Sequence, residues 1–325
     1  MTPGGGHATR RPRLDPRPAA RALHDVGRGV DVEHDGTTLL RYVYVPDDVQ
    51  LESPRPYLHP LRTRRGDVVT ALRPHDHVWH KGVAWSLPVV GDENFWGGPT
   101  YVRDQGYVQL DNDGSMDHQA IVRLDVTSGP DAERVDLVHI LAWHTQDGEH
   151  VVDEERALAA VVPADRDDVW FLLFDTSMTN VSDRALPLGS PTTRGRENAG
   201  YGGLFWRGPR DFTGGTLLAP GFAGGEEVRG TRAPWMGFTG SHDGSGRQST
   251  VVVVDGATNP SHPPQWFART EWFAGVNPAP FFSEEVPFDT GATLRFRYAL
   301  VVAEGPADAD GAAALAARGR ALLDG

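Results

Sequence analysis

The sequence has 325 residues, of which 39% are hydrophobic and 23% charged, enough for one large or two ordinary domains with a buried core. Its 31 basic and 44 acidic residues give a net charge of −13, which argues against binding to nucleic acids or anionic membranes, since both are polyanions. The absence of cysteine excludes disulfides, iron–sulfur clusters, thiolate zinc sites and cysteine nucleophiles, so any metal would need His, Asp or Glu ligands.

Residues 1–22 are rich in Gly, Pro and Arg and have no apolar periodicity, so we expect a disordered basic tail there. The tail lacks the apolar stretch of a secretory signal, and nowhere do 18 apolar residues follow one another. We therefore expect a cytoplasmic protein without membrane spans. Because no change in composition marks a boundary, residues 23–325 are predicted to form a single domain.

Beyond the tail, hydrophobic and polar residues alternate with a period of two, which is typical of β-strands with one buried face. Turn signals at Asp35-Gly36 and Asp147-Gly148 lie between such runs and predict two hairpins, because Gly tolerates the positive φ of tight turns. The predicted strands cover residues 30–33, 39–45, 135–144, 151–162 and 294–300, and short apolar runs at residues 169–175 and 251–255 suit strands that are buried on both faces.

A helical pattern is confined to the C-terminus, where Ala, Leu and Arg dominate residues 310–323. An Asp cap and the final Gly325 fit a short helix there. The 38 Gly and 25 Pro divide the rest into many short strands and loops. The predicted fold is therefore all-β: a large antiparallel β-sandwich with a short C-terminal helix.

Four of the 13 histidines lie between positions 59 and 80. His77 and His80 cannot share one face of a straight strand, but they would converge in a tight loop between Pro74 and Gly82. Imidazoles suit proton transfer and, when neutral, metal ligation, and Asp76 is placed to orient one of the rings. His-x-x-His alone is a weak metal motif, so the segment favours a site without deciding between these roles.

Two further segments carry candidate binding residues. Arg207 ends a Gly-rich run at residues 200–207, and it is placed either to hold a substrate oxygen or to form a surface ion pair. A proline-rich loop at residues 259–266 displays His262 and Trp266. Tryptophan rings can stack on sugars, although large β-proteins also use them to fill their cores.

These segments together resemble the bacterial PmoA-like family, whose members carry the inherited name methane oxygenase PmoA. The resemblance extends from about residue 27 to residue 305, and its most specific block is Asp-His-x-x-His-Lys-Gly. Where the family usually has Pro-His between the outer histidines, this sequence has Val78-Trp79. The other matching blocks are Arg55-Pro56-Tyr57 with His59-Pro60-Leu61, Gly202-Gly203-Leu204-Phe205-Trp206-Arg207, and Asn259-Pro260 with Trp266.

The resemblance implies a sandwich similar to the galactose mutarotase-like supersandwich and a role in carbohydrate catabolism, in partnership with a sugar oxidoreductase. It also implies a site at the histidine segment, with His75 outside the motif. The predicted catalytic residues are His59, Asp76, His77 and His80, and the three histidines are the predicted ligands of a divalent metal if one is bound. The predicted substrate-binding residues are Arg55, Trp79, Lys81, Arg207, His262 and Trp266.

Three functions remain open at this point. The first is an enzyme that acts on a sugar or oxidised sugar as an epimerase, lyase or hydrolase, with the histidines as acid and base. The second is a metal-dependent oxygenase, as the family name implies. The third is a carbohydrate-binding protein without catalysis. Each takes a small molecule or carbohydrate as its ligand.

Overall fold

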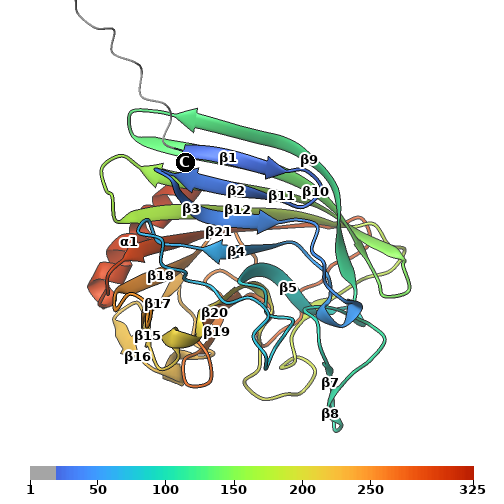
Figure 1. Cartoon of the computed structure of the whole chain (residues 1–325). Coiled ribbons are helices and arrows are strands. Elements are labelled where there is room, and N and C mark those ends of the chain that lie inside the picture. The colour runs from blue at the N-terminus through green and yellow to red at the C-terminus, as the bar shows by residue number, and fades with distance from the viewer. Residues whose placement is uncertain (1–19) are drawn as a thin grey trace, which may run out of the picture.

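Two large antiparallel sheets pack face to face in the computed structural model, which describes residues 20–325 (Figure 1). Most of the predicted basic tail lies outside the described residues, and the last three positions assigned to it, Ala20–Ala22, belong to the first strand. The predicted all-β sandwich with a short C-terminal helix is confirmed. Within residues 20–325, no helix is long and apolar enough to cross a membrane.

The first sheet has ten strands and contains β4 and β5, the two strands that precede and follow the loop with His75, His77 and His80. Its main order is β1-β2-β3-β4-β5-β14-β20-β19, with β6 and β13 paired to β5. The strands are β1 (Ala20–Asp25), β2 (Gly29–His34), β3 (Thr37–Val43), β4 (Tyr57–Leu61), β5 (Val83–Val90), β6 (Glu93–Phe95), β13 (Leu188–Gly189), β14 (Gly203–Arg207), β19 (Gln265–Arg269) and β20 (Gly275–Ala279).

The second sheet has nine strands in the order β16-β15-β17-β18-β21-β12-β11-β10-β9. They are β9 (Ser115–Ser128), β10 (Ala132–His144), β11 (His150–Pro163), β12 (Val169–Asn180), β15 (Thr216–Ala219), β16 (Phe222–Gly224), β17 (Trp235–Ser241), β18 (Gln248–Asp255) and β21 (Thr293–Glu304). A separate hairpin pairs β7 (Thr100–Val102) with β8 (Gly106–Val108). Three short 3-10 turns are η1 (Gln50–Glu52), η2 (Arg210–Phe212) and η3 (Glu226–Val228).

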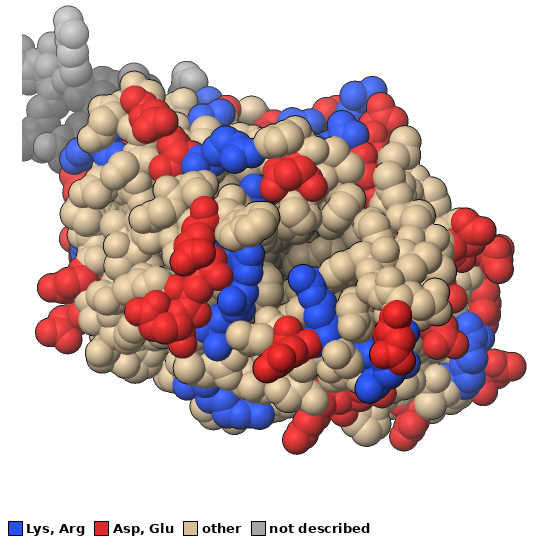
Figure 2. Space-filling view, turned by 90° about the horizontal axis from the view of Figure 1, so that it is seen from below, with Lys and Arg blue, Asp and Glu red and all other residues tan. Residues whose placement is uncertain are grey.

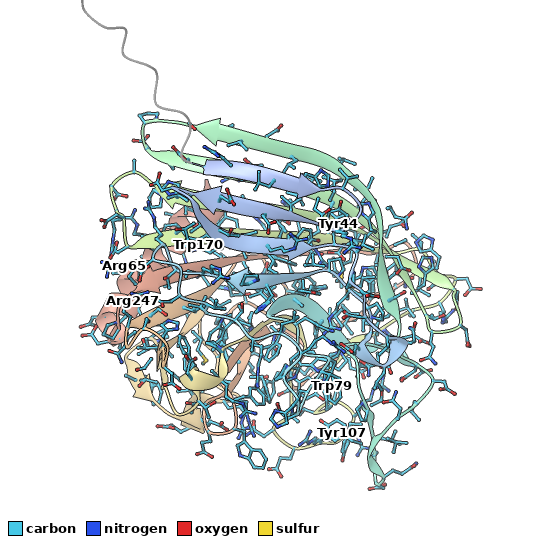
Figure 3. The ribbon with its side chains drawn as sticks, viewed as in Figure 1. Tyr44, Arg65, Trp79, Tyr107, Trp170 and Arg247 are labelled. Atoms are coloured by element: carbon cyan, nitrogen blue, oxygen red, sulfur yellow. The ribbon has the colours of Figure 1, made fainter. Side chains whose placement is uncertain are left out.

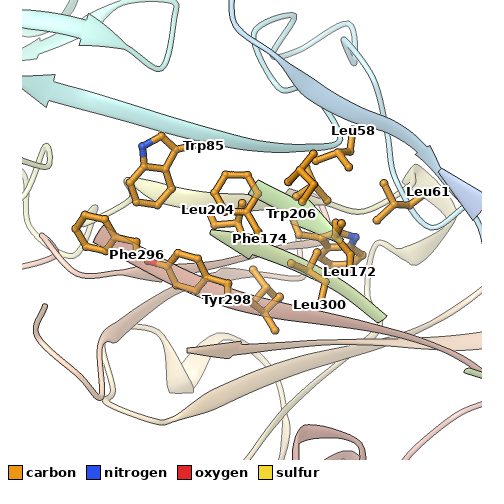
Figure 4. Close-up of a cluster of buried hydrophobic side chains, with 14 of the residues drawn as sticks. Leu58, Leu61, Trp85, Leu172, Phe174, Leu204, Trp206, Phe296, Tyr298 and Leu300 are labelled. Atoms are coloured by element: carbon orange, nitrogen blue, oxygen red, sulfur yellow. The ribbon is translucent and has the colours of Figure 1, made fainter. Parts of the chain in front are cut away.

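The main core lies between the sheets. Alternate residues of each strand point inward, so β14 contributes Leu204 and Trp206 while β21 contributes Phe296, Tyr298 and Leu300 (Figure 4). All five side chains are at most 1% exposed. The alternation predicted for residues 294–300 is therefore the pattern that builds one wall of the core.

The C-terminal helix α1 (Ala309–Asp324) covers the outer face of the nine-stranded sheet. Its N-cap is Asp308, whose side chain accepts a hydrogen bond from the amide of Gly311. Leu315 and Ala316 pack against apolar residues of β18 and β21. The ten-stranded sheet has no such helix in residues 20–325, and its outer face is free to form a site.

A buried histidine links the two sheets. Nδ1 of His139 on β10 lies 2.8 Å from the hydroxyl of Tyr42 on β3, and its Nε2 lies 2.8 Å from Nδ1 of His118. His139 is 0% exposed, and burial lowers its pKa to about 2, with the nearby charge of Arg156 acting in the same direction. The link is therefore built for a neutral imidazole.

Acid should destabilise the wild-type protein more than a His139→Gln variant. An unfolded histidine has a pKa near 6.5, so between pH 6.5 and about 2 the unfolded chain binds more protons at this position, and stability falls as the pH falls. Between pH 7 and pH 5 the wild type should lose about 2 kcal/mol more unfolding free energy than the variant. Urea denaturation at both pH values measures this, and parallel losses would contradict the assignment.

Candidate functional site

Residues 74–80 of the histidine segment lie in the loop between β4 and β5 and fold as two successive turns. The amide of His77 donates to the carbonyl of Pro74 at 3.0 Å, and the amide of His80 donates to the carbonyl of His77 at 2.9 Å. These turns bring the two imidazoles together in a stack, with ring centroids 4.7 Å apart and an interplanar angle of 15°. The convergence predicted for His77 and His80 is therefore present.

Both ends of this loop are held by one buried carboxylate. Glu52 is 1% exposed and accepts hydrogen bonds from Arg73, at 2.8 and 2.6 Å, and from Nζ of Lys81. Lys81 also donates to Asp48 at 2.8 Å and is fully buried. Burial disfavours the charge on Glu52, but these two cations outweigh it and hold the pKa of Glu52 below its usual value. Lys81, predicted to bind substrate, is instead a loop anchor.

Arg55 is a second anchor rather than a substrate ligand. Its Nε donates to Ser86, its Nη1 to the carbonyls of Glu52 and Ser53, and its Nη2 to the carbonyl of Trp79 at 2.7 Å. Arg55 is 2% exposed, uses four of its five N–H donors on protein groups and does not line the cavity. Its effect on the site is to fix the backbone that carries Trp79.

Asp76, His77 and His80 form the polar centre of the loop. Nδ1 of His77 lies 2.9 Å from Oδ2 of Asp76, as predicted for an orienting carboxylate. Burial disfavours the charged form of Asp76, but the hydrogen bond from His77 outweighs it, so the pKa of Asp76 is lowered. Burial also lowers the pKa of His80 well below its usual value, and the charges of His77 and Arg207 add to this. His80 is therefore neutral at pH 7, and its buried Nδ1 has no hydrogen-bond partner within residues 20–325.

A cavity of about 640 Å³ opens beside this loop. Figure 3 places Trp79 and Tyr107 together at this end of the molecule, away from Tyr44 and Trp170, and Figure 2 views the same end, hollowed at its centre and bordered by basic side chains. The polar and charged lining residues are Asp76, His77, His80, Arg196, Glu197, Asn198, Arg229 and Arg269. The aromatic lining residues are Trp79, Trp96, Tyr107, Tyr201, Phe205, Phe267, Trp272 and Phe273.

The far wall of the cavity is the outer face of the ten-stranded sheet. On β14, Phe205 faces the cavity while its neighbours Leu204 and Trp206 face the core. On β19, Phe267 and Arg269 face the cavity in the same way. The period of two in a strand thus separates lining residues from core residues.

Two residues of the proline-rich loop are not in the cavity. Trp266 lies on the core side of β19, is 0% exposed and donates through Nε1 to the carbonyl of Ala233 at 2.7 Å. It fills the core, so its predicted stacking on a sugar is wrong. His262 binds Asp255 at 2.6 Å, at the end of β18, and does not line the cavity either.

His59 is also separate from the other two predicted histidines. Its Nδ1 lies 2.9 Å from the hydroxyl of Thr70, burial lowers its pKa to about 4, and the residue does not line the cavity. No group of three His, Asp or Glu side chains in the described part of the chain is arranged to hold a metal ion. His59, His77 and His80 therefore do not fit the predicted metal site.

Arg207 lies behind the cavity wall rather than in it. Its guanidinium carbon sits 4.0 Å from the ring centroid of Phe273, a lining residue, and the side chain is 2% exposed. Nε and Nη1 have no hydrogen-bond partner in residues 20–325, and burial lowers the pKa of Arg207 to about 10. The positive charge of Arg207 helps to lower the pKa of Asp76. A direct contact between Arg207 and a substrate stays a prediction.

A glycine is required beneath Trp79. At Gly98, where φ is +71°, an added Cβ would lie 2.6 Å from the indole ring. Gly98→Ala is therefore expected to cost about 2–3 kcal/mol of unfolding free energy, from backbone strain and displacement of the ring. Gly106→Ala is the matched control, because φ is +83° there and no atom lies within 4 Å of the new Cβ. The control should lose about 1 kcal/mol by chemical denaturation, and equal losses would contradict the contact.

Comparisons with known proteins give a family and two distant structural likenesses. A model described as a family of unknown function, DUF6807, matches residues 29–317. No curated protein matches the sequence. Among solved structures, the chain is similar to a "putative aldose 1-epimerase" from Klebsiella pneumoniae, with a TM-score of 0.44 and 9% identity over 94% of this chain and 87% of that one. It is also similar to a GH36 alpha-galactosidase from Geobacillus stearothermophilus in complex with raffinose, with a TM-score of 0.36 and 11% identity over 91% and 42% of the two chains.

Proposed function

The chain belongs to the DUF6807 family, whose function is not established, and we propose that it acts on a carbohydrate bound in the cavity, with His77 as the proton-transfer group. The hydrogen bond between His77 and Asp76 carries the proposal. Because Asp76 accepts the proton on Nδ1, the lone pair of a neutral His77 is on Nε2. An imidazole held in this way is a general base, and its carboxylate partner stabilises the cation formed when it takes a proton.

The aromatic walls support a ring-shaped ligand. Trp79 and Trp96 line the inner part of the cavity, and Trp272 stands at its rim with 73% of its surface exposed. Apolar faces of sugar rings stack on such indoles while the hydroxyl groups stay available for hydrogen bonds. The volume of about 640 Å³ is within the range of small-molecule sites.

The proposed chemistry is a balanced proton transfer. Nε2 of His77 takes a proton from a hydroxyl or an acidic C–H of the sugar, the electron pair stays on the sugar, and the imidazolium returns the proton later in the cycle. Sugar epimerases and lyases that work by deprotonation begin with this step, and a hydrolase would use the same base to take a proton from the attacking water, so the proposal covers these three classes. Neutral His80, stacked on His77, adds no second positive charge beside the imidazolium.

The resemblance to the PmoA-like family stays a prediction, as does the oxygenase activity that the name implies. His59 contacts Thr70 and does not join His77 and His80 in a ligand set, so these three histidines do not fit a shared metal ion. A carbohydrate-binding role without catalysis is the second candidate, since the aromatic lining alone supports it.

Proton NMR in D₂O tests the proposal on the full chain. The protein is incubated with neutral and carboxylated hexoses, and binding is measured in parallel by calorimetry. We expect at least one bound sugar to exchange a C–H for deuterium, interconvert its anomers faster or form a new product. Binding without any chemical change would overturn the catalytic role in favour of the binding role. No binding to any member of the panel would overturn both.

A further inference from the structure

Three arginines converge on the part of the cavity formed by β19 and the segments beside it. Arg269 lies on β19, Arg229 follows η3, and Arg196 lies between β13 and β14. Nη2 of Arg229 and Nη1 of Arg269 both lie 3.4 Å from one oxygen of Glu226. Arg196 instead donates to the hydroxyl of Tyr107, with its guanidinium 4.5 Å from the ring centroid. We call these three residues the arginine wall.

Glu226 provides one negative charge for the two arginines that it contacts, Arg229 and Arg269. Glu226 faces two guanidinium groups with a single oxygen, since its other oxygen accepts the amides of Thr270 at 2.9 Å and Glu271 at 3.1 Å. Nε of Arg229 is buried and has no hydrogen-bond partner within residues 20–325. A buried donor without an acceptor is costly unless a ligand or water supplies one.

The electrostatic environment points the same way. Burial lowers the pKa of Arg269, and the charges of Arg229 and Arg196 add to this, while Glu226 and Glu271 oppose it. Among the residues that line the cavity, three arginines stand against two acids, Asp76 and Glu197, on a protein with a net charge of −13. Guanidinium groups bind carboxylate and phosphate oxygens through paired, charge-assisted hydrogen bonds.

We propose that the arginine wall binds an anionic group of the sugar, so that the substrates are carbohydrates carrying a carboxylate or a phosphate. The inference rests on the proposed function, because it places a sugar ring between the arginine wall and His77. The anionic group would accept hydrogen bonds from the guanidinium groups that line the cavity and would share Arg269 with Glu226.

Calorimetry at low ionic strength tests the inference with D-glucose, D-glucuronate and D-glucose 6-phosphate, and with the corresponding galactose set. We expect at least one anionic sugar to bind about tenfold or more tightly than its neutral parent, and this advantage to shrink with added salt. The preferred anion distinguishes carboxylate from phosphate. Equal affinities for neutral and anionic sugars would overturn the inference and leave the proposed function standing, whereas no binding at all would overturn both.

Two charge variants are expected to change the preference for the anionic sugar in opposite directions. Arg269→Gln should reduce the preference for the anionic sugar by about tenfold, while Glu226→Gln should strengthen it, because the amide keeps the hydrogen bonds from the backbone but no longer competes for the arginines. Arg318→Gln, in a surface pair with Asp165 on the other side of the sheets, is the control and should change nothing. If Arg269→Gln does not fold, exposed Arg196→Gln replaces it. An unchanged preference in the folded variants would overturn the inference.

Discussion

Replacing His77 by Gln is expected to lower turnover of the sugar by about 10²- to 10⁴-fold, which is the usual contribution of a positioned general acid or base. Glutamine fills a similar volume and can still accept a hydrogen bond, but it cannot take up a proton. The side chain of His77 is 39% exposed, so the fold should tolerate the change. Binding of the same sugar should fall much less than turnover, because the aromatic walls and the arginine wall remain.

His75→Gln is the matched control for this experiment. His75 lies two residues away in the same loop, its side chain is 80% exposed, and it does not line the cavity. The turnover of Asp76→Asn should lie between those of His77→Gln and His75→Gln, with a loss of about 10- to 100-fold. The reason is that the amide of Asn no longer favours the proton on Nδ1 of His77. Full activity in His77→Gln would rule out the proposed role, whatever the controls do.

Sequence patterns predict two kinds of strand: those with one regular buried face, and the short apolar runs that lie within β12 and β18. The Asp35-Gly36 hairpin joins β2 to β3, and the alternation at residues 294–300 lies within β21. Strand β9 lies outside the predicted strands, although Val122, Leu124 and Val126 alternate with polar residues in its second half, where most side chains on both faces are exposed. Strand β1, which pairs with β2, is also mostly exposed and has no regular buried face. The composition of its first residues places them in the predicted tail.

Local sequence patterns were sufficient to predict the turns of the site, but they could not reveal which distant residues its side chains would contact. Pro74 and the spacing of His77 and His80 predict tight turns, and the turns alone bring the two rings together. Whether Lys81 binds a ligand or a buried carboxylate depends on Glu52, which is 29 residues away. Sequence spacing cannot reveal such a partner.

The arginine wall illustrates the same limit more strongly. Arg196 precedes β14 and Arg269 lies on β19, and these two strands both pair with β20. Arg229 joins them because the amide of the next residue, Gly230, donates to the carbonyl of Trp266 on β19. One local signal is present in the sequence, the Trp272-Phe273 pair that begins three residues after the strand residue Arg269. That signal predicts an aromatic wall but gives no hint of the two other arginines.

Replacing Lys81 by Met is expected to cost about 3–5 kcal/mol of unfolding free energy, because it leaves buried carboxylates without their cation. The side chains of Lys81, Asp48 and Glu52 are 0%, 4% and 1% exposed, so water cannot take the place of the ammonium group. Oδ2 of Asp48 already lacks a partner, and the substitution would remove the bond to Oδ1 as well. Urea denaturation measures the loss.

Two variants decide whether the loss comes from the buried charges. Arg318→Met breaks an exposed pair with Asp165 and should cost at most about 1 kcal/mol. Adding Asp48→Leu to Lys81→Met should recover part of the loss, because it removes the buried carboxylate that Lys81→Met leaves without a cation, while Arg73 still neutralises Glu52. A loss no larger than that of Arg318→Met, or no recovery in the double variant, would mean that the loop is not anchored electrostatically. If Lys81 anchors the loop, Lys81→Met should also speed amide hydrogen exchange across residues 73–80. It should weaken sugar binding as well, since His77 and Trp79 depend on that loop for their positions.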